Sequence, residues 1–95
     1  MKIYFITEGN KNIGFGHITR CVSLYQAFEE KGLSPCLMVN GDESIYNLLK
    51  DKKYEIFNWV KNPEDLVDKI KDCDIAIIDS YLATPEMYKK ISDAF

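Results

Sequence analysis

The sequence of 95 residues predicts an α/β fold in which helices cover both faces of a parallel sheet. Three observations predict this fold. Short apolar runs of strand length alternate along the chain with stretches whose apolar residues recur at helical spacing. Two of the helical stretches start with a proline at the first helical position. The last apolar run, residues 75–78, is continuous, which is typical of a strand buried on both faces.

The first half of the chain is predicted to form a strand, a loop, a helix and a second strand. Residues 2–7 make the first strand, and residues 8–16 make the turn-rich loop after it. The helix that follows has its apolar residues at helical spacing, at Ile18, Cys21, Val22, Tyr25 and Phe28. Gly32 is placed as the glycine that ends this helix, and residues 36–39 make the second strand.

The second half is predicted to contain two further strands, residues 54–57 and residues 75–78, with Asp79 at the end of the latter. A helical segment precedes the first of them, with apolar positions at Ile45, Leu48 and Leu49. Residues 62–65 combine a candidate N-cap asparagine, a proline and two acids, which marks the start of a helix with apolar residues Leu66, Val67 and Ile70.

The last predicted helix starts at residues 84–86, where threonine, proline and glutamate repeat the same start pattern. Its apolar face is expected to hold Tyr88, Ile91 and Phe95.

The strict alternation of strands and helices implies right-handed crossovers and therefore a Rossmann-like fold. We expect the strand order 3-2-1-4, so that the first and fourth strands are neighbours and the winding reverses between them. Residues 1–95 are expected to form one domain. We also expect this domain to be the N-terminal part of a longer protein, because a sheet of this kind normally adds a further strand.

Composition and charge exclude several classes of partner and site. The formal net charge is −3 and the lysines are scattered between acids, so no basic stripe is present to bind nucleic acid. The apolar run of residues 3–6 is too short for a signal sequence or a membrane span, and we expect a cytoplasmic protein. Three cysteines without C-x-x-C spacing and a single histidine predict neither a disulfide framework nor a metal site. No cofactor is expected.

Gly14 and Gly16 lie in the loop after the first strand, where ligands bind in doubly wound sheets. Unpaired backbone N–H groups at the helix start attract anions, and the two glycines would let a phosphate or sugar approach that backbone closely. The alternative is a tight turn without a ligand. A P-loop is excluded because its lysine is missing, and a dinucleotide fingerprint is disfavoured by Thr19 and Asn40.

His17 is predicted to lie in the first turn of the helix, on this ligand edge of the sheet. The positive end of the helix dipole opposes protonation there, which favours a neutral imidazole that can accept a proton. His17 is therefore a candidate general base, and its alternative is a surface or hydrogen-bonded core histidine. Arg20, one turn on, either steadies a phosphate or carboxylate or is a solvated surface side chain. Cys21 is expected to pack beneath the helix.

Asp79, Ser80 and Tyr81 end the fourth strand, so they are expected at the same carboxyl edge. With the first and fourth strands as neighbours, these residues and His17 would flank one crevice. For Asp79, a carboxylate that caps the loop by accepting backbone N–H groups is favoured over direct catalysis. Tyr81 either forms a wall of the crevice or offers its hydroxyl to a ligand.

The segments "IGFGHITRC" and "IIDSY" resemble the N-terminal domain of a known family across essentially the whole chain. This is the PseG-like family of UDP-2,4-diacetamido-2,4,6-trideoxy-β-L-altropyranose hydrolases of pseudaminic acid biosynthesis, with relatives in spore coat polysaccharide biosynthesis. The family belongs to the MurG-like group with the two-domain GT-B fold. G-x-G-H-x-x-R followed by D-x-Y is far more specific than G-x-G alone.

The resemblance implies that His17 activates water for attack on the anomeric carbon, with inversion and release of UDP and without a metal. It implies that Tyr81 contacts or orients the sugar, and that Gly14 and Gly16 line the loop beside the diphosphate. Arg20, Asp79 and Ser80 are the further candidate substrate-binding residues. A second, C-terminal domain would supply most uridine contacts. Members usually carry an arginine and an acid shortly after the first strand, where this chain has residues 8–11 as Glu-Gly-Asn-Lys.

The leading hypothesis is therefore the sugar-side domain of a nucleotide-sugar hydrolase acting on a UDP-linked diacetamido-trideoxy sugar. A rival within enzymes is a GT-B glycosyltransferase in which His17 deprotonates an acceptor hydroxyl instead of water. A rival of another class is a non-catalytic binding or assembly module, in which the glycine turn and His17 are structural.

Overall fold

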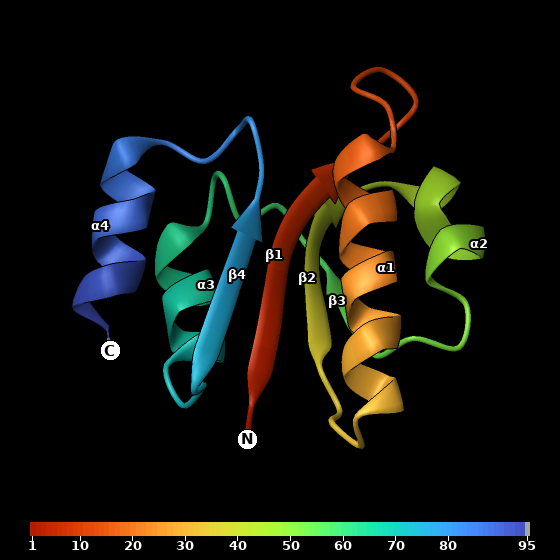
Figure 1. Ribbon diagram of the computed structural model, residues 1–95. Helices are drawn as coiled ribbons and strands as arrows, with labels where there is room; N and C mark the ends of the chain where they lie inside the picture. The colour runs from red at the N-terminus through yellow and green to blue at the C-terminus, as the bar shows by residue number, and fades with distance from the viewer. Residues whose placement is uncertain (95) are drawn as a thin grey trace.

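Four parallel strands form the sheet in the computed structural model, which describes residues 1–94 (Figure 1). The strands are β1 (Ile3–Gly9), β2 (Cys36–Gly41), β3 (Tyr54–Ile56) and β4 (Ile75–Asp79). Their order is β3-β2-β1-β4, and every neighbouring pair is parallel. The predicted α/β class and strand order are confirmed.

Helices cover both faces of the sheet, as predicted (Figure 1). One face carries α1 (Gly16–Glu30) and α2 (Tyr46–Leu49), which follows a short 3-10 turn (Glu43–Ile45). The other face carries α3 (Pro63–Ile70) and α4 (Pro85–Asp93). Within residues 1–94, no helix is both long enough and apolar enough to cross a membrane.

The central strand β1 supplies side chains to two separate cores, because successive residues of a strand point to opposite faces. Ile3 and Phe5 pack beneath α1 with Ile18, and Ile6 packs against α3 and α4. Burying a large aliphatic or aromatic side chain stabilises a fold by about 1.5–3 kcal/mol. Two small cores on one strand thus hold the helices of both layers in place.

The strand β4 packs on both faces, with Ile77 against one core and Ile78 against the other, but it is only half buried and not fully buried as predicted. Its residues are partly accessible along their length, and Ile75 is 37% exposed. The reason is its place in the sheet: β1 pairs with one side of β4, and within residues 1–94 no strand pairs with the other side. The continuous apolar run therefore reflects side chains that pack on the faces of the sheet, and it does not indicate a strand enclosed by neighbours on both sides.

The buried face of α4 also differs from the prediction. Met87 and Ile91, four residues apart, are the buried side chains of this helix, and Tyr88 is 42% exposed. Tyr88 follows Met87 by one residue, which turns it about 100° away from the core face. Phe95 lies outside the described residues.

The predicted starts of the last two helices are confirmed, but only one of the predicted caps forms. Thr84 accepts a hydrogen bond from the Met87 N–H at 3.3 Å, so it caps α4. Asn62 stands at the N-cap of α3 without capping it, because its side-chain amide donates to the Asn58 carbonyl at 2.8 Å. Gly32, with φ of 82°, ends α1 as predicted.

The carboxyl ends of β1 and β2 approach each other so closely that a side chain does not fit between them. A Cβ placed on Gly41 would stand 2.5 Å from the Gly9 carbonyl oxygen and 2.7 Å from Cδ1 of Ile45. Because the nearest atom is a backbone oxygen of β1, β1 and β2 would have to separate to make room for the side chain.

We expect Gly41→Ala to lower the free energy of unfolding by about 1–3 kcal/mol, the usual cost of overpacking. Urea denaturation measures it. The matched control is Gly16→Ala, where a Cβ meets nothing within 4 Å; it should cost nothing and gain up to about 1 kcal/mol of helix propensity. Equal stability of the two variants would contradict the close approach.

Candidate functional site

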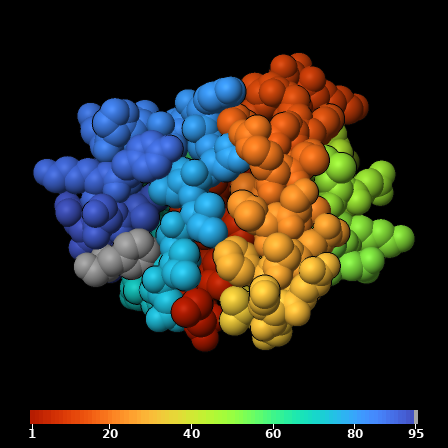
Figure 2. Space-filling model, viewed as in Figure 1, coloured from red at the N-terminus to blue at the C-terminus, as the bar shows by residue number. Residues whose placement is uncertain are grey.

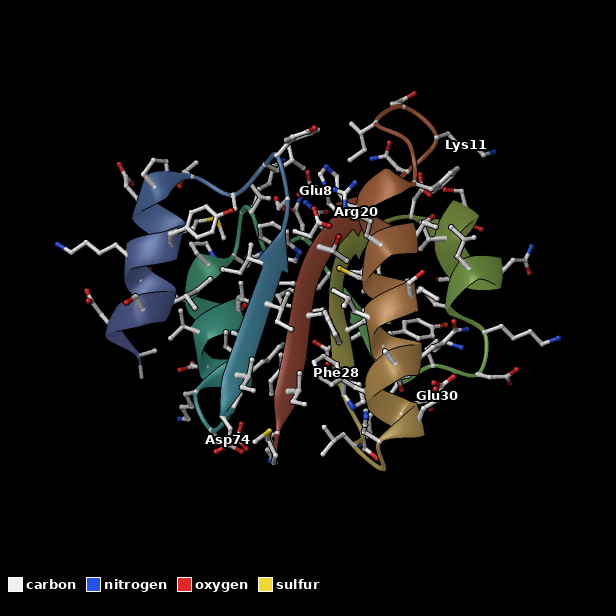
Figure 3. All side chains as sticks on the ribbon, viewed as in Figure 1. Glu8, Lys11, Arg20, Phe28, Glu30 and Asp74 are labelled. Atoms are coloured by element: carbon white, nitrogen blue, oxygen red, sulfur yellow. The ribbon has the colours of Figure 1, made fainter. Side chains whose placement is uncertain are left out.

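The candidate site lies where the carboxyl ends of β1 and β4 meet the start of α1. Glu8 and Arg20 lie at this edge of the sheet, and Asp74 marks the opposite edge (Figure 3). On the molecular surface, the segment after β4 touches the first turns of α1 (Figure 2). The winding reverses between β1 and β4, and ligands of open α/β sheets bind at such a point.

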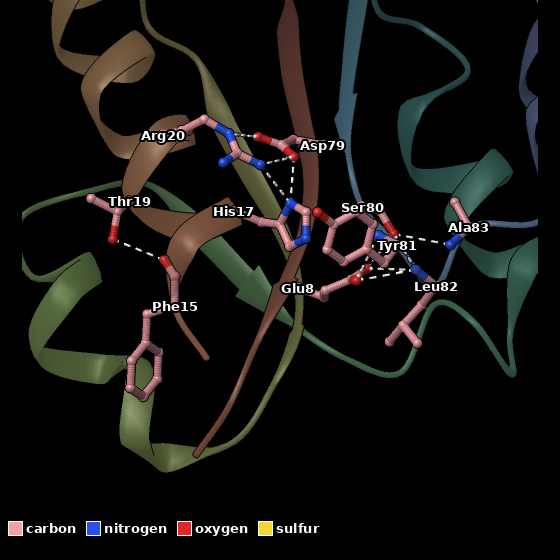
Figure 4. Close-up of polar contacts among 10 residues, drawn as sticks. All are labelled: Glu8, Phe15, His17, Thr19, Arg20, Asp79, Ser80, Tyr81, Leu82 and Ala83. Atoms are coloured by element: carbon pink, nitrogen blue, oxygen red, sulfur yellow. Dashed lines mark hydrogen bonds and ion pairs between the residues drawn. The ribbon is translucent and has the colours of Figure 1, made fainter. Parts of the chain in front are cut away.

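His17, Arg20 and Asp79 form one cluster at this edge (Figure 4). The pairing of Thr7 with Asp79 in the sheet places the Asp79 carboxylate beside the first two turns of α1. Nδ1 of His17 is 2.5 Å from Asp79 Oδ1. Arg20 binds the same carboxylate with two groups, Nε to Oδ2 and Nη2 to Oδ1, each at 2.7 Å. The predicted juxtaposition of His17 with Asp79 is confirmed.

Both side chains that hydrogen bond to His17, Asp79 and Arg20, stand at the same ring nitrogen, Nδ1. A carboxylate only accepts hydrogen bonds, so the Nδ1 that faces Asp79 is assigned the proton and donates it. Arg20 Nη2 also lies 2.9 Å from Nδ1, and because a guanidinium only donates, with the proton on Nδ1 its hydrogen bond goes to Oδ1 of Asp79. In a neutral imidazole with this tautomer the lone pair is on Nε2, and no group in residues 1–94 hydrogen bonds to Nε2.

The charges of the cluster favour an ionised Asp79. The hydrogen bonds from Arg20, followed by that from His17, hold the pKa of the Asp79 carboxyl below its usual range. In turn, the hydrogen bond to Asp79 and the charge of that carboxylate raise the pKa of the Arg20 guanidinium. The His17 side chain is only 11% exposed, against 61% for Arg20. The arginine therefore stands on the solvent side and the imidazole is held beneath it.

Tyr81 packs against His17 and is otherwise open to solvent. The two rings meet edge to face, with their centroids 4.4 Å apart and their planes at 86°. Tyr81 is 89% exposed, far more than an aromatic residue usually is. Of the two alternatives for Tyr81, this contact corresponds to a wall beside the imidazole. The position agrees with the prediction that Tyr81 and His17 flank one site.

The loop after β4 is capped by Glu8, and not by Asp79 as predicted. All hydrogen bonds to the Asp79 carboxylate come from the side chains of His17 and Arg20. The Glu8 carboxylate instead accepts from the Ser80 hydroxyl and from the backbone N–H groups of Tyr81, at 2.8 Å, and Leu82, at 3.1 Å. The reason is the register, which brings Glu8 next to Ser80 and leaves Asp79 beneath α1.

Glu8 is the site residue that sequence reasoning missed. The sequence places it in a turn-rich loop, whereas β1 continues to Gly9 and buries Glu8 to 1% exposure. An available signal was an acid two residues after the apolar run of a central strand, where the carboxyl edge of the sheet lies.

The glycine loop closes on itself before α1 begins. Asn10 and Gly14 exchange two backbone hydrogen bonds, and Asn10 Oδ1 accepts from the N–H groups of Asn12 and Ile13. Gly14 has φ of 84°, a conformation that a glycine adopts without strain. No side chain caps the start of α1 and its first turn holds no acid, so the charge closest to this helix end is the Asp79 carboxylate that contacts His17.

Two side chains of the candidate site, Tyr81 and Arg20, are largely exposed to solvent. A hollow of about 370 Å³ does lie at the same sheet edge, but its lining comes from the glycine loop and the segment after β2, namely Lys11, Asp42, Glu43 and Ser44. His17, Asp79 and Tyr81 do not line it.

The cysteines take no part in this cluster. Cys21 is buried beneath α1 as predicted, and burial raises the pKa of its thiol to about 11, so it is protonated at neutral pH. Cys36 and Cys73 are free and partly buried. Within residues 1–94, no three side chains of the metal-binding types lie close enough together to hold an ion.

Comparisons with protein families, with curated proteins and with solved structures give no match to this chain.

We expect Arg20→Gln to raise the pKa of Asp79 toward the ordinary value of about 3.9, because the guanidinium is the first cause of its lowering. A carboxyl carbon NMR titration measures the change. A carboxyl whose folded pKa lies below the unfolded value stabilises the fold above about pH 3.9, and this contribution is lost as pH falls through the folded pKa. The acid unfolding of Arg20→Gln should therefore begin at a higher pH.

Lys69→Gln is the control for this titration, because Lys69 pairs with Glu55 on the edge strand β3. It should leave the Asp79 titration unchanged. An Asp79 pKa that does not respond to Arg20→Gln would contradict the electrostatic account of the cluster.

Proposed function

We propose that this chain is the sugar-side half of a nucleotide-sugar hydrolase in which His17 is the general base. One observation carries the proposal: Nδ1 of His17 is held by Asp79 at 2.5 Å, which leaves Nε2 free to take a proton at the carboxyl edge of the sheet. A histidine held by a carboxylate in this way is the arrangement that general base catalysis uses. A histidine with a merely structural role would gain nothing from a free Nε2.

In the proposed reaction, a water molecule attacks the anomeric carbon of the sugar. Nε2 of His17 takes a proton from that water as its oxygen bonds to carbon, and the bond from carbon to the nucleotide's phosphate oxygen breaks. The products are the free sugar and UDP, and the imidazolium later returns its proton to solvent. Asp79 stabilises the imidazolium, and Arg20 keeps the carboxylate ionised and oriented.

The diphosphate is assigned to the start of α1. Its backbone N–H groups lack a capping side chain, no acid stands in the first turn, and Gly16 leaves open space above it. Such a helix start favours an anion. Tyr81, beside His17, offers an exposed aromatic ring to the sugar. The sequence resemblance adds the identity of the substrate, a UDP-linked diacetamido-trideoxy sugar of surface polysaccharide biosynthesis.

The proposal includes a second α/β half that binds the nucleotide, as the resemblance to the two-domain GT-B group implies. The exposure of the site supports this part, because Tyr81 is 89% exposed and the Arg20 side chain is 61% exposed. Closure of a second half would exclude water from the diphosphate and orient the anomeric carbon against Nε2. The cytoplasm, where nucleotide sugars are made, is the proposed location.

The reaction type is tested with the full-length protein and the UDP-sugar in the absence of any acceptor. Hydrolysis predicts UDP and free sugar in equal amounts, with the anomer of inverted configuration as the first product in NMR spectra. Release of UDP only after an acceptor alcohol is added would replace the hydrolase with a glycosyltransferase. No release under either condition would favour a non-catalytic binding module.

We expect His17→Ala to lower kcat by about 10²–10⁴-fold with little change in KM or Tm, because a positioned general base supplies rate and not binding. UDP release in the full-length protein measures kcat. Gln26→Ala, at an exposed position on the same helix, is the matched control and should retain full activity. A His17→Ala protein that melts early but turns over normally at low temperature would contradict the assignment.

A further inference from the structure

We propose that Glu8 is a positioning residue: its carboxylate fixes the turn after β4 and so places Tyr81 against His17. This goes beyond the proposed base chemistry, because it concerns what sets the wall of the site. It rests on contacts that hold whether or not His17 acts as a base.

The first argument is the burial of Glu8. Its side chain is 1% exposed, and within residues 1–94 it forms no ion pair with a lysine, arginine or histidine. Burying a carboxylate without a counter-charge costs several kcal/mol unless hydrogen-bond donors satisfy it. Glu8 therefore depends on the donors around it, and those donors are held in turn by the carboxylate.

The second argument is where these donors come from, because all of them belong to one turn. The Ser80 hydroxyl, the Tyr81 N–H and the Leu82 N–H point at the two oxygens of Glu8. Ser80 Oγ then accepts from the N–H groups of Leu82 and Ala83, each at 2.9 Å. A single buried carboxylate thus organises four consecutive residues, as Figure 4 shows.

The third argument is that Tyr81 has little else to hold it. Its side chain is 89% exposed, and its ring packs on His17 with centroids 4.4 Å apart. The N–H bond to Glu8, at 2.8 Å, fixes the backbone from which that ring projects. If this hydrogen bond is lost, the turn after β4 is no longer held in place, and the exposed Tyr81 ring moves away from the imidazole of His17.

The chemistry of the position calls for a carboxylate in particular. Glu8 faces only donors, and an ionised carboxylate is a pure acceptor with two oxygens. A glutamine of the same length would keep one oxygen and turn an amide NH₂ toward an N–H or O–H group. Because both oxygens of Glu8 are occupied by the turn, its role is to position and not to exchange protons with substrate.

The test uses the imidazole as the reporter, since His17 is the only histidine of the chain. Proton and nitrogen NMR spectra of ring-labelled histidine are recorded for the wild-type chain and for Tyr81→Leu, which defines the shift that the tyrosine ring causes. We expect Glu8→Gln to move the His17 ring signals at least half of the way to the Tyr81→Leu values. The matched control is Glu55→Gln, which removes the same charge on β3 and should move nothing.

A folded Glu8→Gln chain with wild-type His17 signals would overturn the proposal. If Glu8→Gln does not fold, Ser80→Ala decides, because it removes the hydroxyl that links Glu8 to the turn. Its His17 signals should move in the same direction by a smaller amount, and unchanged signals would overturn the proposal.

A second measurement separates this inference from the proposed function. In the full-length protein, Glu8→Gln should raise KM for the UDP-sugar more than it lowers kcat, since it displaces the Tyr81 wall and leaves His17 with Asp79. A shift of the His17 signals without any hydrolase activity in the wild type would uphold the role of Glu8 and refute the hydrolase. An active wild-type enzyme, together with His17 signals that Glu8→Gln leaves unchanged, would uphold the hydrolase and refute the role of Glu8.

Discussion

The pairing of β1 with β4 is the constraint on which the site depends. The two strands are distant in the sequence, and their register sets Thr7 beside Asp79. From that point, the alternation of the strand sends the Asp79 carboxylate toward α1 and brings Glu8 to Ser80 and the turn after β4. A shift of one residue in this register would exchange the two faces and separate every polar contact of the site.

Two carboxylates at this edge have opposite surroundings and therefore separate tasks. Asp79 is partly exposed and forms an ion pair with Arg20, whose side chain is largely in solvent. Such an exposed ion pair contributes little to the stability of the fold. The effect of Asp79 is geometric, since its contact with Nδ1 orients the ring of His17. Glu8 is buried and faces neutral donors only, so each of its hydrogen bonds is needed to offset the loss of water. One carboxylate holds the imidazole, and the other holds the residue beside it.

A hydrogen bond from the indole of Trp59 fixes the carboxyl end of β1 on one face of the sheet. Trp59 is fully buried, and its Nε1 donates to the Thr7 carbonyl at 2.9 Å. That bond ties the segment after β3 to the residue that precedes Glu8 in β1. The strand from which Glu8 projects is thus held by sheet pairing on both sides and by an indole on one face. A buried carboxylate requires such a fixed base if its donors are to remain in place.

The sequence by itself determined the elements, the parallel α/β fold, the strand order and the presence of His17 and Asp79 at one edge. These follow from local signals: apolar periodicity, prolines at helix starts, and the rule that carboxyl ends of parallel strands share an edge. The tertiary structure decided the rest: Glu8 and not Asp79 caps the turn, Met87 and not Tyr88 enters the core, and Trp59 reaches Thr7. The role of Glu8 and the contact of Trp59 depend on register, because contacts between distant residues are set by how complete layers pack and no local pattern encodes them. The burial of Met87 is different, since its spacing of four residues from Ile91 is a local helical pattern.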